Sequence, residues 1–368
     1  MEGTTNSDIR LNNRKRLVSL LFRHGPMTKQ EIAASLHISL PTVSTILKEL
    51  AEQMLVTESG SMNSTGGRKA TSYAPILDAK YSLGADASEQ GLRIVLLDLG
   101  GNIVATAFHP IQRDNTLAYW SKVSEIIEDF GLQHTEQGKK LLEVGITLEE
   151  SMKDGQLALR DNQVAHLDLR TAADCFQRKV TFRNSTKMAA MAQIWALENW
   201  NSNFVFLKLG NHVRGALVYQ GDVVDFSNIN GEFGDMLLMN GSQDRLAQRF
   251  SLQRFCESLG VPEISAAFER IEQEKEQAVA VWNTYLDDVA ALLYNLHCIF
   301  GWQIIVGGML SPYIEQHKND LVQKIQAHSV LEMEDEFPLT ISNLGEFGAA
   351  VGAALLPIDA FLSSSSEL

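Results

Sequence analysis

Three hydroxyl side chains and one cation lie within seven residues of one another near the N-terminus: Thr42, Ser44, Thr45 and Lys48. Hydroxyl groups donate and accept hydrogen bonds, and a lysine ammonium attracts anions. If the stretch is helical, these groups lie on the face opposite a stripe of apolar residues. Such a face suits hydrogen bonds to base edges and ion pairs with phosphates, which is the chemistry of binding double-stranded DNA.

Two short helices joined by a tight turn at 37–39 are predicted to position these side chains. Thr28 opens the first helix and forms a capping box with Glu31. Ser39 is the expected N-cap of the second helix, and Pro41 is tolerated in its first turn. The inner face of the second helix carries apolar residues at helical spacing: Val43, Ile46, Leu47, Leu50 and Met54. A helix pair in an ordinary bundle has the same pattern, so this pair alone leaves both interpretations open.

A predicted β-hairpin after the second helix favours DNA binding. Its strands are expected at 55–58 and 70–73, and the loop between them ends in two glycines followed by Arg68 and Lys69. Cations at the end of such a loop suit the phosphate backbone or the minor groove, as in the wing of a winged helix-turn-helix. The predicted DNA-binding residues are therefore Ser39, Pro41, Thr42, Ser44, Thr45, Lys48, Arg68 and Lys69.

Charge is unevenly distributed along the 368 residues, whose formal net charge is -14. Residues 1–75 hold nine Lys/Arg against six Asp/Glu, whereas the remainder holds 22 Lys/Arg against 39 Asp/Glu. A mildly basic head on an acidic body fits local contact with DNA and excludes a protein that coats nucleic acid throughout. With 45% hydrophobic residues, the chain is long enough for more than one domain with a core.

The three cysteines, Cys175, Cys256 and Cys298, lie far apart and form no C-x-x-C pair. This spacing suggests neither a disulfide framework nor a cysteine-rich metal site, and it fits a reducing cytoplasm. The polar N-terminus has no apolar signal core, and no segment is expected to approach a membrane span. The sequence thus predicts a cytoplasmic protein without a membrane partner.

The order of predicted elements indicates an α/β body after the head. Residues up to Leu11 are expected to be disordered, and a support helix is expected at 12–24. Strands at 81–87, 92–98 and 103–108 should form an antiparallel meander. A following helix should turn five residues inward: Leu117, Trp120, Val123, Ile127 and Phe130. The later predicted elements are strands near 144–146, 179–182, 203–209, 215–219, 304–306 and 339–341 and helices at 171–177, 187–197, 245–259, 261–300 and from 347.

Several motifs, taken in order, resemble the ROK family, which groups sugar-responsive repressors, such as xylose repressors, with sugar kinases. They are the wing segment 64–68, an Asn-centred strand-to-helix turn, G-E-x-G at 231–234, I-I-V-G-G at 304–308 and the small-residue run 348–354. The resemblance covers nearly the whole chain. It implies a winged helix-turn-helix at 1–75 and a two-lobed actin-like body at 76–368. The first lobe would span about 76–185 plus the C-terminal helix, and the second about 186–345.

The chain departs from the family's kinase motifs. The D-x-G-G-T phosphate loop corresponds to 86–90, which keeps Asp86 but loses the glycines whose backbone approaches phosphate closely. The second phosphate loop corresponds to 210–214 and has lost its later glycines, although Arg214 could still attract an anion. Ser185 stands where the kinases carry the Asp that takes a proton from the sugar hydroxyl, and a serine is not basic near neutral pH. The sequence therefore predicts no enzyme activity.

The family's zinc site is also absent from the sequence. Asp235 replaces the His of G-E-x-G-H, and residues 240–253 contain none of the family's three cysteines. One carboxylate and Cys256 do not make a tetrahedral zinc site, so Cys256 is expected to be a small buried residue. No metal and no cofactor are predicted.

The resemblance maps the effector site to Asn184, Ser185, Glu232 and Asp235. A neutral sugar is the expected ligand, because Glu149 and Glu150 replace the family's P-G turn and would repel a sugar phosphate. A cleft that has lost its ligand remains an equal alternative.

Together, these features predict a DNA-binding regulator that acts on a DNA operator as a repressor of carbohydrate-related genes. A homo-oligomer is expected, since one recognition helix contacts only a few base pairs. The alternatives are a sugar kinase with an appended helical domain and a regulator that responds to a protein partner.

Overall fold

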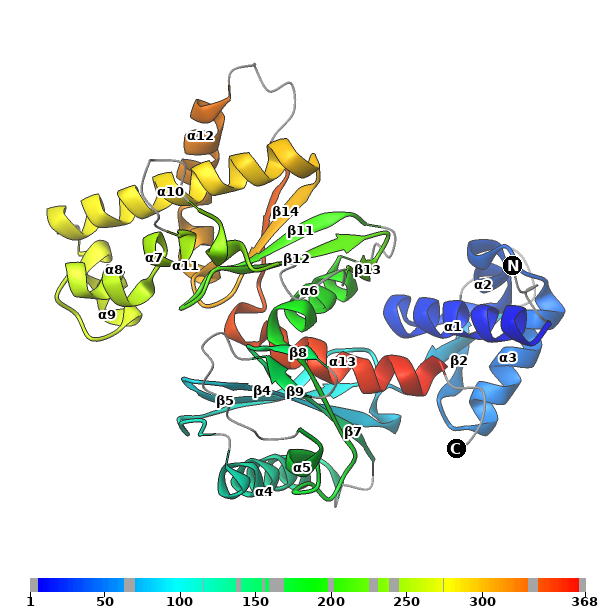
Figure 1. The fold of residues 1–368 in the computed structure, drawn as a ribbon. Helices are drawn as coiled ribbons and strands as arrows, with labels where there is room; N and C mark the ends of the chain where they lie inside the picture. The colour runs from blue at the N-terminus through cyan, green and yellow to red at the C-terminus, as the bar shows by residue number, and fades with distance from the viewer. Residues whose placement is uncertain are drawn as a thin grey trace. The chain divides into compact units, whose positions relative to one another are not determined.

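The computed structural model describes residues 6–62, 70–114, 116–136, 140–153, 156–158, 169–197, 202–224, 231–237, 245–273, 275–329 and 337–363. The chain forms two compact units (Figure 1). The first unit comprises 1–148, 155–182 and 353–368, so it contains both the head and the first lobe of the body. The second unit comprises 149–154 and 183–352.

The head is the predicted winged helix-turn-helix, with three helices and a sheet of order β1-β3-β2. Its elements are α1 (Asn6–His24), β1 (Met27–Thr28), α2 (Lys29–Leu36), α3 (Leu40–Glu52), β2 (Val56–Met62) and β3 (Ala70–Pro75). The expectation of disorder up to Leu11 is wrong for residues 6–11, which form the start of α1. Arg10 and Arg14 on this helix pair with Glu49 of α3, and these ion pairs hold the first turns against the head.

The hairpin has longer strands than expected. Strand β2 continues past Glu58 to Met62, because it pairs with β3 over its whole length through a register shift near Ser59. Residues 63–69 lie outside the described residues, and the predicted wing cations Arg68 and Lys69 are among them.

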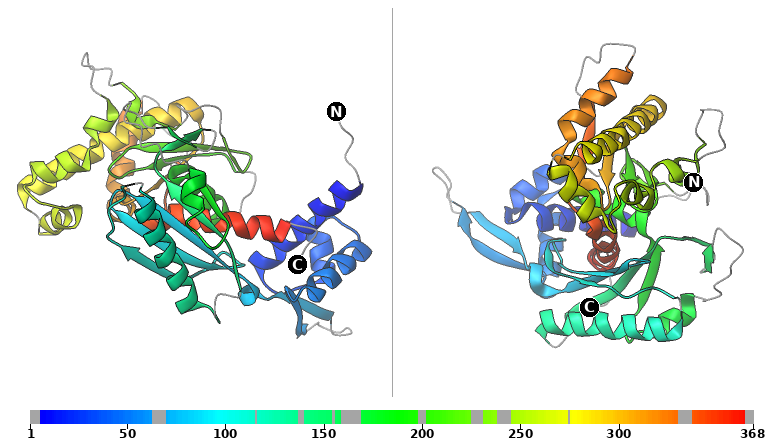
Figure 2. Two further views of the ribbon diagram at one scale, coloured as in Figure 1. Left: turned by 60° about the horizontal axis from the view of Figure 1, so that its bottom comes forward. Right: turned by 90° about the vertical axis from the view of Figure 1, so that its left-hand side faces the viewer.

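A five-stranded sheet of order β10-β7-β4-β5-β6 forms the centre of the first lobe. The predicted meander is confirmed, with β4 antiparallel to β5 and β5 antiparallel to β6. Helix α4 lies on one face of the sheet and the end of α13 (Gly348–Ser363) on the other (Figure 2). The lobe's elements are η1 (Leu77–Ala79), β4 (Tyr81–Ser88), β5 (Gly91–Asp98), β6 (Ile103–His109), α4 (Leu117–His134), β7 (Leu141–Leu148), β9 (Gln156–Ala158), α5 (Leu169–Ala173) and β10 (Val180–Asn184).

Four of the five residues predicted to point inward from α4 are buried: Trp120, Val123, Ile127 and Phe130. The prediction is wrong for Leu117, which is 50% exposed. Leu117 is the first residue of the helix, directly after the capping Thr116, where the chain has not yet turned onto the sheet.

The second unit is built on a mixed sheet of order β13-β12-β11-β14-β15. Helix α6 packs on one face, where Ala190 and Ile194 belong to one buried apolar cluster with Phe206 and other strand residues. The remaining helices bury the larger core on the opposite face, which includes Val205 and Val306. The elements are β8 (Ser151–Lys153), α6 (Ser185–Ala196), β11 (Phe204–Lys208), β12 (Arg214–Tyr219), β13 (Asp222–Val223), η3 (Phe233–Asp235), α7 (Leu246–Arg249), α8 (Leu252–Ser258), α9 (Ile264–Glu272), α10 (Glu276–Phe300), β14 (Gln303–Gly307), α11 (Ser311–Gln316), α12 (Lys318–His328), β15 (Leu339–Ile341) and η4 (Gly345–Phe347).

The two long helical runs predicted at 245–259 and 261–300 are each broken into two helices. Ser251 stops the first run because its hydroxyl caps α8 by accepting from the backbone N–H of Arg254 at 3.3 Å. The second run breaks between α9 and α10, where Gln273 leaves the helix and Lys275 is extended.

The last helix, α13 (Gly348–Ser363), is unusually apolar. Residues 345–362 have a mean hydropathy of 1.4 and match a membrane span in length and composition, so the expectation that no segment approaches one is wrong on those two criteria. Burial of 56% of this segment within the fold is the pattern of a core helix. Its small residues allow close packing, since a Cβ on Gly352 would lie 1.8 Å from the carbonyl oxygen of Met188 on α6.

We predict that Gly352→Ala lowers the free energy of unfolding by about 1–3 kcal/mol, the usual cost of overpacking a core. Gly348→Ala in the same helix is the matched control, because its Cβ would meet its neighbours at 3.5 and 3.7 Å, which is ordinary contact. Urea unfolding of both variants makes the comparison. Equal stability of the two would contradict the close approach of α13 to α6.

Candidate functional site

Capping residues define both ends of α2 and the start of α3. Thr28 and Glu31 form the predicted capping box, in which the backbone N–H of Thr28 donates to the Glu31 carboxylate at 2.7 Å. This hydrogen bond lowers the pKa of Glu31. His37 takes the left-handed conformation that ends α2. Ser39 then caps α3, accepting from the backbone N–H of Thr42 at 3.3 Å.

Helix α3 is two-sided, as the sequence predicts. Val43, Ile46, Leu47 and Leu50 are all buried. The prediction is wrong for Met54, which is 71% exposed. Helix α3 ends at Glu52, and Met54 has a φ of +57°, so the helical spacing no longer applies there.

The exposed side of α3 begins with hydroxyl groups close together. Ser39 Oγ and Thr42 Oγ1 lie 2.8 Å apart, and Thr45 Oγ1 donates to the carbonyl of Pro41 at 3.0 Å. A hydroxyl that donates once still has lone pairs to accept from a base or from water. The Lys48 side chain is 79% exposed, and its ammonium lies 3.8 Å from Glu52. An exposed ion pair of this length is weak, so the ammonium remains available to a phosphate.

Leu40 also belongs to this surface, although it is not among the residues predicted from the sequence. It is the first residue of α3 and is 46% exposed. An exposed apolar side chain beside hydroxyl groups suits contact with a thymine methyl group. Its position directly after Ser39, the expected N-cap, could have shown that it lies at the start of the recognition helix.

In the second unit, Asn184 organises the start of α6. Its amide oxygen accepts from the backbone N–H of Lys187 at 3.1 Å, which caps the helix. Its amide nitrogen donates to the carbonyls of Glu149 and Glu150 at 3.2 and 3.3 Å. Both the oxygen and the nitrogen of the Asn184 amide are therefore hydrogen-bonded to the backbone.

Ser185 is fully buried beside a lysine that the sequence analysis missed. Lys208 Nζ donates to Ser185 Oγ at 3.2 Å and lies 3.6 Å from a Glu149 carboxylate oxygen. His212 approaches the other carboxylate oxygen of Glu149 at 3.8 Å. The Lys208 ammonium offsets part of the negative charge expected to repel a sugar phosphate. Lys208 ends β11 just before Gly210, and this position at the phosphate-loop match was the signal for it.

Glu232 and Asp235 are each matched by an arginine. Arg214 lies 3.6 Å from the Glu232 carboxylate, and its guanidinium also donates to the carbonyl of Glu149. Both side chains of this ion pair are largely buried. Arg245 donates to the carbonyl of Asp235 at 2.8 Å and lies 3.9 Å from its carboxylate. The structure thus gathers Asn184, Ser185 and Glu232 around Glu149, Lys208 and Arg214.

In the first unit, the phosphate-loop match is a tight turn between β4 and β5. Asp86 is buried and accepts from Thr147 Oγ1 at 2.6 Å. Arg93 donates to Ser88 Oγ at 3.3 Å. A Cβ on Gly91 would lie 2.5 Å from the carbonyl oxygen of His109, so the neighbouring strand closely approaches this turn.

Cys256 is buried, as expected, and burial raises the pKa of its thiol. A raised pKa disfavours the thiolate that binds zinc. Within the described part of the chain, no three His, Cys, Asp or Glu side chains are grouped so that they could hold a metal ion.

The fold and the head together define a winged helix-turn-helix protein with a ROK-type body. A family model described as MarR matches residues 13–63. The xylose repressor of Bacillus subtilis (strain 168) is 21% identical over 376 residues, covering 95% of this chain and 96% of the repressor. The DNA-binding transcriptional dual regulator NagC of Escherichia coli (strain K12) is 27% identical over 92 residues, 25% of this chain and 23% of NagC.

Solved structures share the fold. A ROK family transcriptional regulator, described as a homologue of the E. coli MLC protein, has a TM-score of 0.73 at 19% identity and covers 96% of this chain and 97% of its own. A ROK family glucokinase from Streptomyces griseus, in complex with glucose and AMPPNP, has a TM-score of 0.61 at 17% identity over 75% of this chain and 99% of its own. The predicted resemblance and fold class are confirmed.

We predict that the purified protein holds no stoichiometric zinc, because the Cys256 thiol is disfavoured as a ligand and Asp235 pairs with Arg245. Elemental analysis should find well below one zinc per chain, in the wild type and in Cys256→Ser alike. A chelator should leave the melting temperature unchanged, since structural zinc contributes directly to folding. One zinc per chain that disappears in Cys256→Ser would overturn the prediction.

Proposed function

We propose that the protein is a DNA-binding transcriptional repressor that responds to a sugar and does no phosphoryl transfer. The observation that carries the proposal is the two-sided helix α3, capped at Ser39 and exposed on its polar face. The match of its head to the MarR model and its likeness to xylose repressors support the same function.

We propose that α3 enters the major groove and contacts DNA through Ser39, Pro41, Thr42, Ser44, Thr45 and Lys48, with Arg68 and Lys69 of the wing on the backbone. One such helix contacts only a few base pairs, so specificity requires two heads on a repeated half-site. We therefore infer a homo-dimer or a larger assembly, acting in the cytoplasm.

The body would hold the effector among Asn184, Ser185, Glu232 and Asp235. Ser185 offers no base for phosphoryl transfer, and Lys208 already occupies its hydroxyl. This arrangement argues against the alternative of a sugar kinase. A ligand must compete with the pairing of Arg214 and Glu232, so a regulator that answers to a protein partner remains the second candidate.

Lys48→Ala should weaken operator binding and lower the slope of log K against log salt by about one unit, because one phosphate contact is lost. Lys324→Ala in α12 removes the same charge from the second unit and is the matched control. Fluorescence anisotropy between about 50 and 200 mM salt covers the range over which phosphate contacts dominate. An unchanged slope for Lys48→Ala, or an equal change in the control, would show that α3 is misassigned.

A neutral sugar should bind the body and lower its affinity for operator DNA, since only a ligand that prefers the DNA-free form shifts the equilibrium. Calorimetry with D-xylose, D-glucose and their phosphates, with and without operator DNA, measures both effects. Glu232→Ala and Asn184→Ala should abolish sugar binding, whereas Gln253→Ala on α8 should not.

Tight binding of a sugar phosphate would contradict the expected repulsion by Glu149 and Glu150. If no sugar binds and both variants still regulate normally, the protein-partner alternative replaces the sugar.

A further inference from the structure

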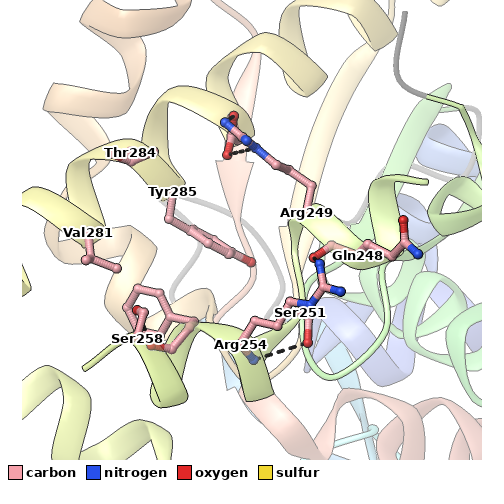
Figure 3. A pocket seen from close by; sticks show the side chains of 10 residues that line it. Gln248, Arg249, Ser251, Arg254, Ser258, Val281, Thr284 and Tyr285 are labelled. Atoms are coloured by element: carbon pink, nitrogen blue, oxygen red, sulfur yellow. Dashed lines mark hydrogen bonds and ion pairs between the residues drawn. The ribbon is translucent and has the colours of Figure 1, made fainter. Parts of the chain in front are cut away.

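A pocket of about 380 Å³ lies within the second unit, between α10 and the segment that contains α7 and α8 (Figure 3). Its size falls in the range of small-molecule sites. None of its lining residues belongs to the effector residues described above. The lining residues are Gln248, Arg249, Ser251, Arg254, Phe255, Ser258, Val281, Thr284, Tyr285 and Asp288.

Tyr285 places a buried hydroxyl in this pocket. The residue is 6% exposed, and no described group lies within hydrogen-bonding distance of its hydroxyl oxygen. A buried hydroxyl without a partner costs free energy, so such groups point to a missing ligand or water. In Figure 3 the hydroxyl end of Tyr285 points toward the side of the pocket where Ser251 and Arg254 lie.

Aromatic packing holds the Tyr285 ring in this orientation. The ring stacks on Trp282, with centroids 5.5 Å apart, and meets Phe250 and Phe255 edge-on. Burial raises the pKa of the phenol, and the nearby Asp288 raises it further. The phenol therefore stays protonated at neutral pH and offers an O–H donor.

Two guanidinium groups line the pocket, and only that of Arg249 pairs with the pocket's carboxylate. Arg249 makes two hydrogen bonds with the Asp288 carboxylate, at 2.6 and 2.9 Å, and these charges offset each other. Arg254 makes a single long side-chain contact among the described residues, to the carbonyl of Gln248 at 3.5 Å. A guanidinium has five N–H donors, so most of those on Arg254 are free for a ligand.

We propose that this pocket binds a small organic carboxylate, held by the Arg254 guanidinium and the Tyr285 hydroxyl. A guanidinium and a carboxylate match as two parallel hydrogen bonds, and a phenol O–H adds a third donor. The pocket's one excess positive charge suits a monoanion better than a phosphate dianion. Phe255 and Val281 add apolar side chains to the lining of the pocket. This second ligand site does not depend on the proposed function.

Calorimetry on the full chain without DNA tests the proposal with sodium benzoate and sodium gluconate as probes. Benzamide is the matched neutral probe for benzoate, and inorganic phosphate tests the other oxyanion. We expect saturable 1:1 binding of at least one carboxylate and none of benzamide. Arg254→Ala and Tyr285→Phe should each weaken binding about tenfold or more, the loss expected for a hydrogen bond to a charged group.

Gln253→Ala is the control on α8, because Gln253 neighbours Arg254 but pairs with Glu257 outside the pocket. It should bind the carboxylate as the wild type does. Tyr285→Phe keeps the aromatic packing, so its melting temperature without ligand should not fall. The proposal is overturned if neither carboxylate binds, if binding persists unchanged in both pocket variants, or if phosphate binds more tightly than both carboxylates.

Discussion

The arrangement of the head depends on the burial of one face of α3. Four apolar side chains fix the rotation of this helix about its axis, and the Ser39 cap fixes where it begins. Together they determine which groups reach solvent: Thr45 and Lys48 are exposed because Val43 and Ile46 are not. The Thr28–Glu31 capping box begins α2, and the left-handed His37 ends it directly before Ser39, the N-cap of α3. A polar surface becomes a recognition surface only when its orientation is fixed in this way.

In the body, the side chains of the candidate effector site are already engaged with one another. Lys208 lies against Ser185, and Arg214 lies against Glu232. Largely buried charges must be paired to be tolerated, and these contacts occupy groups that a ligand would use. An effector that bound here would have to exchange these internal contacts for its own. Such an exchange is the kind of differential interaction through which a ligand can shift a conformational equilibrium.

Local patterns predicted the elements and their order well. The capping box, the Ser39 cap and the antiparallel meander follow from short-range rules, and all three are confirmed. Errors arose where a pattern was extended past its element. Met54 and Leu117 have helical spacing but lie at or beyond a helix end. The break between α9 and α10 contains no proline, so no helix-breaking residue marks it in the sequence.

The candidate effector site was less predictable, because its contacts join residues that are distant in sequence. Asn184 and Glu232 were located by motif, but a motif does not show that Asn184 caps a helix and binds the backbone of Glu149. Lys208 lies two residues before the phosphate-loop match, but a sequence position does not show that it contacts Ser185. The pocket at Tyr285 is a similar case, since it joins α10 to a segment some thirty residues earlier in the chain.

If α3 gives the protein sequence-specific DNA binding through paired heads, the bound DNA should carry a repeated half-site. Selection of bound sequences from random double-stranded DNA measures this. We expect the wild-type chain to enrich a repeated half-site, and Thr42→Ala and Thr45→Ala to change the base preference within each half-site. No enrichment, or an identical motif from the wild type and both variants, would contradict this expectation.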